Sequence, residues 1–520
     1  MSLNTLASST TSSCFLVNFL SARATLGVMA FLMFLITQMI RINVYIVLLD
    51  MGPKAPVNGT DDEVTILPEW NENKFSLFMG AFYWSYWATE LPGGILAQKF
   101  GGKRIMGICI TAASLLNFLL PFACHNSFLL ASIIRALQGL SLGVTWPVMH
   151  WLSARWIPQS ERSKFMTSYH GAAIGTSITY PLAGIIIANY GWESVFYVIG
   201  TVSLVWCLAW WILIYDSPKE HPRLSESERK YLEEALGNSV TLSTNKRSGH
   251  PWREIMQSKP FWAVLMASQG LMWGTLTLSM QTPTYFHQVH GLDIKSTGLL
   301  SGIPEISKFF FALLFSAMID RVIDRKILTV TQARKVAVAV SRHTNTLSLE
   351  RFNRVFHPPG ELIPAVLLLL LGVFGYTDKI LATVLLSGTC LVGGASASGS
   401  LANIIDISPN HAGTLLGLIK TLTIIPGVIS PLMVTNLTSD PKAKKSIQWR
   451  NVFGLIAIIY SACGTIYLIF GSGKVQPWNE KPEKDKSKEE TGFLEDRKLD
   501  ERRISEVPLN TQLVAQKEEK

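Results

Sequence analysis

The feature that most constrains the fold is a series of long apolar segments separated by short polar linkers. Helices of about 20 apolar residues are long enough to cross a bilayer. In lipid each segment must satisfy its own backbone hydrogen bonds, so the segments are expected to be helices. They lie roughly at 26–49, 75–96, 105–124, 128–150, 165–189, 193–214, 261–281, 298–318, 361–377, 379–402, 411–437 and 451–470.

A polar stretch at 215–258 divides these twelve segments into six and six. We therefore expect an amino-terminal six-helix bundle at 26–214, a cytoplasmic central loop at 215–258 and a carboxy-terminal bundle at 259–470. Cytoplasmic tails at 1–25 and 471–520 flank the bundles. The second tail is dense in Lys and Glu, which indicates disorder.

Basic residues predict which ends of the segments face the cytoplasm. Lys99, Lys103 and Arg104 follow the second segment, so this linker is expected inside, and both termini with it. The first long linker is acidic and carries an Asn-Gly-Thr sequon, so we predict it outside, with a glycan on Asn58. The basic linker before the last segment disagrees with this topology, but it comes late in the chain.

Composition excludes several classes of function. With 48% hydrophobic and 16% charged residues, the chain fits a membrane protein rather than a soluble one. The net charge of +9 does not indicate nucleic-acid binding, because the basic residues lie mostly between apolar segments. The six cysteines lack zinc spacing. We predict no enzyme, no metal site and no cofactor other than a coupling ion.

Two related turns indicate two related halves. The first is "GGILAQKFGGKR" (93–104), and "SAMIDRVIDRK" (316–326) repeats its pattern six segments later. Glycine allows close helix packing and tight turns, and basic residues hold the cytoplasmic face. Related halves are typical of transporters that expose a midplane site alternately to each side. The motif residues are Gly94, Lys99, Gly101, Gly102, Lys103, Asp320 and Arg321.

These turns resemble the signature of the major facilitator superfamily. The stretch "RALQGLSLGVTWPVMHWLSARWIPQSERSKF" (135–165) resembles its anion/cation symporter branch: sodium-dependent phosphate cotransporters, sialin and vesicular glutamate transporters. Within that branch the chain is similar to inorganic phosphate cotransporters of the insect type. The resemblance implies an all-α membrane fold of twelve transmembrane helices in two pseudo-symmetric six-helix bundles. It also implies secondary active transport of a small anion.

Arg41 and Arg135 are the leading candidates for binding that anion. Each lies about seven or eight residues from the predicted outer end of its segment, so the two are expected at one depth. A guanidinium binds carboxylate or phosphate with two parallel hydrogen bonds. The structural alternative is that each arginine pairs with a helix carbonyl or an acid and locks a gate.

Other polar residues inside the segments complete the predicted site. Gln38 and Tyr45 share the helix face of Arg41, and Lys420 adds a positive charge near mid-depth. Residues assigned to coupling or gating are Glu90, His150, Asp406 and Asn43. For Glu90 and His150, a structural pairing is the alternative.

Departures from the family bear on substrate and coupling ion. Proton-coupled relatives carry an acid where this chain has Leu142, which favours sodium over proton. Vesicular glutamate transporters carry a histidine and an arginine where this chain has Met79 and Leu271, which argues against glutamate. Open alternatives are a proton-coupled transporter of acidic sugars in endolysosomes and a non-transporting sensor or scaffold. Residues 337–351 interrupt the family pattern as an insert. The plasma membrane is favoured, with endolysosomal or vesicular membranes as alternatives.

Overall fold

The computed structural model describes residues 21–52, 70–90, 92–158, 161, 165–218, 221–222, 224, 226, 228–232, 252–324, 362–391, 407–408, 412–472 and 475–479. Asn58, Asp406 and the insert at 337–351 lie outside these ranges. Within them the secondary structure is helical, with no strand. The predicted all-α membrane fold is therefore confirmed wherever the structure describes the chain.

In the described part of the amino-terminal half, eight α-helices correspond to the six expected segments. Two segments are divided: Pro92 lies between α2 and α3, where its missing N–H ends the first helix, and Gly143–Val144 separates α5 from α6. The helices are α1 (Ala22–Met51), α2 (Glu72–Glu90), α3 (Gly93–Phe100), α4 (Gly102–Asn126), α5 (Phe128–Leu142), α6 (Thr145–Trp156), α8 (Gly171–Tyr190) and α9 (Glu193–Leu213), with a 3₁₀ turn, η4 (Thr167–His170), before α8.

The carboxy-terminal half is also built of helices where the structure describes it. Its described helices are α11 (Trp252–Gln257), α12 (Lys259–His290), α13 (Ile294–Asp324), α16 (Leu362–Phe374), the apolar helix Lys379–Leu391, α18 (Ala412–Leu422), α19 (Ile425–Thr438) and α20 (Lys445–Phe470). Glu305, Lys308 and Pro304 do not interrupt the eighth segment, because α13 runs through all three. Seven helices or helix pairs of the described chain are long and apolar enough to cross a membrane.

Apolar side chains on the outside of the bundle identify the lipid-facing surface. On α4, Ile108, Leu115, Leu119 and Phe122 are exposed at helical spacing, and a similar row runs along α5. In water such rows would be unfavourable, whereas in hydrocarbon they need no partner. The exterior is therefore apolar, and polar side chains such as Asn43, Asn117 and Gln138 are buried among the apolar side chains of the core.

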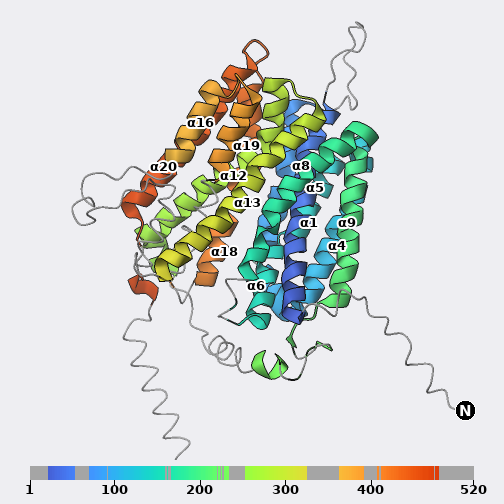
Figure 1. Cartoon of the computed structure of the whole chain (residues 1–520), viewed down its shortest axis with the longest axis vertical. Coiled ribbons are helices and arrows are strands. Elements are labelled where there is room, and N and C mark those ends of the chain that lie inside the picture. The colour runs from blue at the N-terminus through green and yellow to red at the C-terminus, as the bar shows by residue number, and fades with distance from the viewer. Residues whose placement is uncertain are drawn as a thin grey trace, which may run out of the picture.

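The two halves meet closely toward one end of the molecule. We call the end with Met51, Glu72 and His290 the predicted outer end, and the end with Ala22 and Lys259 the predicted cytoplasmic end. Figure 1 shows the halves converging at the predicted outer end and diverging toward the other, where α6 and α18 lie. The conformation is thus closed at the predicted outer end.

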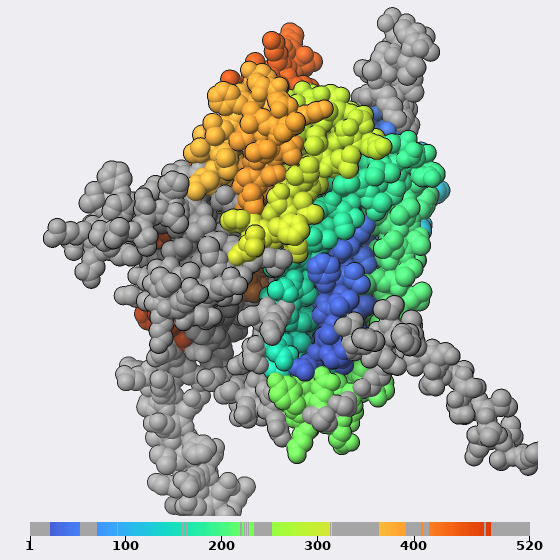
Figure 2. All heavy atoms as spheres, in the orientation of Figure 1, coloured from blue at the N-terminus to red at the C-terminus, as the bar shows by residue number. Residues whose placement is uncertain are grey.

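Side-chain and backbone contacts support this closure. Near the predicted outer end, Ser76 of α2 hydrogen-bonds Thr435 of α19, and Gly427 of α19 receives the ring of Tyr83. The seam between α8 and α13 is equally tight: a Cβ added to Gly298 would collide with the Tyr180 carbonyl. Figure 2 shows α13 in direct surface contact with α8 of the amino-terminal half. These contacts position the polar interior between the two halves.

Candidate functional site

Arg41 of α1 points toward α2 and lies among aromatic rings. Its guanidinium carbon is 4.8 Å from the ring centroid of Tyr86, 5.2 Å from that of Phe82 and 5.8 Å from that of Tyr83. Ring faces attract a guanidinium without saturating its hydrogen-bond donors. Arg41 Nε is buried and has no hydrogen-bond partner among the described residues. This guanidinium is therefore held in place while donor capacity remains for a ligand.

Glu90 and Lys420 complete a group of charges around Arg41. Glu90 ends α2, one turn beyond Tyr86, and is only 8% exposed. The charges acting on its carboxylate are Lys420 of α18 and Arg41 of α1. One carboxylate therefore sits with two cations, one from each half of the protein. The group, which we call the central charge cluster, has a surplus of one positive charge.

Aromatic residues border the central charge cluster toward the predicted cytoplasmic end. Lys420 Nζ lies 5.1 Å from the ring of Trp146, which belongs to the other half. The Trp146 ring packs against Phe34 and Tyr169 at centroid distances of 4.9 and 5.2 Å. His150 stacks on Tyr169 at 5.1 Å and shares a 3.2 Å hydrogen bond between its Nδ1 and the tyrosine hydroxyl. His150 thus has a structural partner and lies beside the cluster.

Arg135 is placed differently from Arg41, although the two lie at the same depth as predicted. Its side chain is 0% exposed. Nη1 donates to the carbonyl of Ile40 at 3.1 Å and to Gln138 Oε1 at 3.0 Å, and Nη2 donates to the carbonyl of Arg41 at 2.8 Å. In this conformation the predicted two-arginine clamp is not open to an anion, because Nη1 and Nη2 of Arg135 both donate to α1 or to Gln138 on its own helix.

The contacts of Arg135 continue into a buried polar network. Asn117 Oδ1 of α4 accepts from Asn43 Nδ2 at 3.2 Å and from Gln138 Nε2 at 3.4 Å. Asn117 Nδ2 donates to the carbonyl of Phe196 in α9 at 2.7 Å. The sequence analysis missed Asn117 and Gln138. Their polarity within apolar segments was the available signal.

Two further predicted site residues of α1, Gln38 and Tyr45, are covered by neighbouring helices, although Tyr45 still interacts electrostatically with Arg41. Gln38 Nε2 donates to Thr176 Oγ1 of α8 at 3.2 Å, across the inside of the amino-terminal half. Tyr45 is 1% exposed and belongs to the core of that half. The helix-face argument placed both near Arg41 in sequence register, but neighbouring helices occupy their polar atoms or cover them.

The first motif turn has an evident structural basis. Gly101 has φ +90°, and its position is crowded by the carboxylate of Asp216, which accepts from Lys103 N at 2.7 Å. A side chain at Gly101 would be strained and would collide with this cap. The close helix approach that we predicted at Gly94 occurs instead at Gly93, where an added Cβ would lie 2.7 Å from Pro147 Cγ. One residue rotates the contact by about 100° around the helix.

The remaining motif residues are less informative. Lys99 Nζ lies 5.3 Å from the ring of Phe100, and Gly102 begins α4 against Trp151. Asp320 and Arg321 fall within α13, and their side chains lie outside the described part of the chain.

A second pair of charges lies within the membrane-spanning part of α13. Glu305 Oε2 is 3.7 Å from Lys308 Nζ, one turn along the helix. Charged residues inside a continuous membrane helix are a functional signal in their own right.

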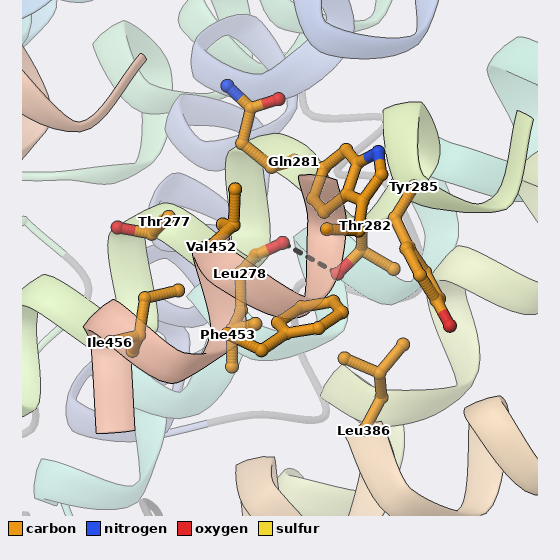
Figure 3. Close-up of a pocket in the computed structure, with 10 residues that line it drawn as sticks. Thr277, Leu278, Gln281, Thr282, Tyr285, Leu386, Val452, Phe453 and Ile456 are labelled. Carbon is orange, nitrogen blue, oxygen red and sulfur yellow. Dashed lines mark hydrogen bonds between the residues drawn. The ribbon is translucent and has the colours of Figure 1, made fainter. Parts of the chain in front are cut away.

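A pocket inside the carboxy-terminal half is a poor candidate for the site. Figure 3 shows it between α12 and α20, with Leu278, Leu386, Phe453 and Ile456 around it and the Thr282 hydroxyl bonded to the Leu278 carbonyl. Its lining carries no charged side chain. Within the described residues, no group of three or more His, Cys, Asp or Glu is arranged to hold a metal ion. The central charge cluster is therefore the best site for a charged ligand.

Comparison with known proteins agrees with this architecture. The Major Facilitator Superfamily profile matches residues 11–340. The chain is 31% identical to vesicular glutamate transporter 2 of Homo sapiens over 486 residues, 93% of this chain and 79% of that protein. It is 32% identical to human sialin over 476 residues, covering 88% and 91% of the two chains.

Solved structures show the same fold. A D-xylose-proton symporter superposes with a TM-score of 0.65 at 12% identity, covering 88% of this chain and all of that one. A bacterial homologue of the lysosomal transporter Spinster, in an inward-facing and occupied conformation, superposes with a TM-score of 0.61 at 12% identity, covering 88% and 99% of the chains. With the profile match and these relatives, the chain is an integral multi-pass membrane protein of the transporter type, not an enzyme, and belongs to the Major Facilitator Superfamily.

Proposed function

We propose that this protein is a secondary active transporter of a small anion, either inorganic phosphate or an organic carboxylate, that works by alternating access. The observation that carries the proposal is the central charge cluster, in which Arg41 and Lys420, from opposite halves, both interact electrostatically with the Glu90 carboxylate. A surplus positive charge in a low-dielectric interior is costly unless an anion occupies it. The cluster therefore suits a ligand with at least one negative charge.

The origin of the two cations suggests how binding drives movement. Arg41 belongs to the amino-terminal half and Lys420 to the carboxy-terminal half. An anion between them attracts both, so it favours a state in which the halves approach each other around the site. Glu90 acts in this scheme as the counter-ion that keeps the two cations together when the site is empty.

The coupling ion is proposed to be a cation that moves with the anion. Sequence departures favoured sodium, and this stays a prediction. Glu90 is a poor site for this cation, because Arg41 and Lys420 would repel a metal ion or a proton there. The names of the relatives support organic carboxylates such as glutamate, but Met79 and Leu271 bring no charge to the site.

Uptake into liposomes containing the purified protein tests this proposal. Radiolabelled inorganic phosphate, L-glutamate and N-acetylneuraminate are offered in parallel, each with a sodium gradient, a pH gradient, both or neither. We expect saturable uptake of at least one anion that one of the gradients accelerates. A protein that neither takes up nor exchanges any anion would instead be a sensor or scaffold of the same fold.

Membrane compartment and glycosylation form a separate proposal. We place the protein in the plasma membrane, with Asn58 outside, although the relatives include vesicular transporters. Cell-surface biotinylation measures the location. Glycosidase treatment measures the glycan: it should lower the mass of the unaltered protein and leave the mass of Asn58→Gln unchanged. Recovery only in vesicle fractions would reverse the assignment.

A further inference from the structure

We propose that Glu305 in α13 is the carboxylate that takes up the coupling proton, and that its ion pair with Lys308 opens when the proton binds. This inference rests on the proposed cation-coupled transport. It assigns the coupling ion to a second site, separate from the anion site.

Glu305 is buried in the middle of a membrane-spanning helix. It is 7% exposed, and among the described residues its ion-pair partner is Lys308, whose Nζ lies 3.7 Å from Glu305 Oε2, beyond hydrogen-bond distance. The ammonium side chain is the more accessible of the two, with 23% exposure against 9% for the carboxylate side chain. Burying an ion pair costs more than its Coulomb energy returns unless the geometry is tight. A loose buried pair of this kind is suited to being opened and closed.

Neighbouring elements supply few other charges. Tyr180 of α8 and Cys390 of the helix Lys379–Leu391 interact electrostatically with Glu305. His170, at the start of α8, acts on Lys308 and packs its ring 6.1 Å from Phe309. Glu305 thus faces one close cation, whereas Glu90 faces two. A proton approaching Glu305 meets less repulsion than one approaching Glu90.

Glu305 and Lys308 lie beside the contact between α13 and α8, along which the two halves must move during alternating access. Along α13, Gly298 packs against the Tyr180 carbonyl, and an added Cβ at Gly302 would lie 2.7 Å from the Ser177 carbonyl. Both partners belong to α8 of the other half. When the halves rock against each other, the water access of Glu305 must change with this seam. The charge state of Glu305 is therefore linked to the conformation.

The proton step balances without any further reactant. A proton from water on one side binds the Glu305 carboxylate, and the ammonium of Lys308 turns to the accessible side with its charge unchanged. The charge of the pair then rises from zero to plus one. After the halves have rocked, the proton leaves to water on the other side and the ion pair re-forms.

The test separates driven accumulation from exchange. Liposomes containing the purified protein are loaded with inorganic phosphate, L-glutamate or N-acetylneuraminate. Two rates are measured for each anion: accumulation driven by a pH gradient, and exchange at equal concentrations without a gradient. We expect Glu305→Gln, which mimics the protonated acid, to reduce driven accumulation at least tenfold while exchange persists.

Two further variants serve as control and safeguard. Glu193→Gln removes an exposed carboxylate that pairs with His125 at the predicted outer end, and it should leave both rates unchanged. If Glu305→Gln fails to fold because Lys308 loses its partner, the double variant Glu305→Gln with Lys308→Met removes both charges together. It should show the same uncoupled behaviour.

Several results would overturn the inference. Glu305→Gln or the double variant could retain pH-driven accumulation, or Glu90→Gln could give the uncoupled behaviour instead. Accumulation that follows sodium and ignores pH in the unaltered protein would also reject a proton at Glu305. Absence of both exchange and uptake in the unaltered protein would overturn the proposed function itself, and this inference with it.

Discussion

Arg41 and Arg135 are the same residue type at the same level in helices that touch, and both lie over the ring of Phe82, yet their hydrogen-bond partners differ. Arg135 is fully enclosed and donates to two carbonyls of α1 and to Gln138. Arg41 lies against three aromatic rings and interacts electrostatically with Glu90 and Lys420. Hydrogen bonds to protein oxygens hold Arg135, whereas ring faces and electrostatic attraction hold Arg41.

This difference shows how the bilayer penalty of an arginine can be offset in two ways. Charge-assisted hydrogen bonds to backbone oxygens hold Arg135 and fix α1 at the level of Arg41. Ring faces and a distant carboxylate hold Arg41 without consuming all its donors. The two arginines act together, because Arg135 positions helix α1, which carries Arg41. Four predictions test this division.

The largest effect is expected from Arg135→Met. This change deletes three charge-assisted hydrogen bonds and leaves Gln138 and the carbonyls of α1 with fewer partners, so the free energy of unfolding should fall by about 3 kcal/mol or more. Thermal unfolding of the purified protein in detergent measures it. Arg155→Met is the matched control, because Arg155 is exposed and its guanidinium carbon lies 3.9 Å from the ring centroid of Trp151. It should lower the free energy of unfolding by less than about 1 kcal/mol. Equal costs would remove the distinction between the two arginines.

Arg41→Lys should affect binding rather than stability. Lysine keeps the charge but loses the two-pronged guanidinium, so the anion loses about 1.5 to 3 kcal/mol, roughly tenfold or more in affinity. We expect a raised KM in liposome uptake and a melting temperature close to that of the unaltered protein. Unchanged anion affinity with reduced turnover would instead make Arg41 a gate residue.

Lys420→Met and Glu90→Gln should change affinity in opposite directions. The first removes the surplus positive charge of the cluster, so KM should rise several-fold. The second raises the surplus to two, so the anion should bind several-fold more tightly at low ionic strength. Direct binding of the transported anion to the purified protein measures both. Shifts of the same sign would show that Glu90 is not the counter-ion of these two cations.

The smallest effect is expected from Gln38→Leu. Its amide donates to Thr176 at 3.2 Å, inside the amino-terminal half, so KM should change by less than about threefold. The lost hydrogen bond should cost on the order of 1 kcal/mol of stability. Uptake and thermal unfolding of the same preparation separate the two effects. A large rise in KM would return Gln38 to the binding site.

Much of the fold was predictable because the bilayer restricts the choices. Apolar segments of sufficient length must be helices, so α1, α4 and α9 appear within a few residues of their expected bounds. Breaks within segments were harder to predict. Pro92 ends α2, whereas Pro304 is accommodated inside α13, because a proline is tolerated where neighbouring groups satisfy the freed carbonyl.

The sequence by itself determined the membrane helices, the two related halves, and the identity and depth of the charged side chains. It did so because length, hydropathy and residue type are local properties. Only the tertiary structure decided the partners that come from other helices, namely carbonyls of α1 for Arg135, and Lys420 and Arg41 for Glu90, whereas Glu305 and Lys308 lie one turn apart on the same helix. Partnership depends on which faces of distant helices meet, because electrostatic and hydrogen-bond energies fall steeply with distance.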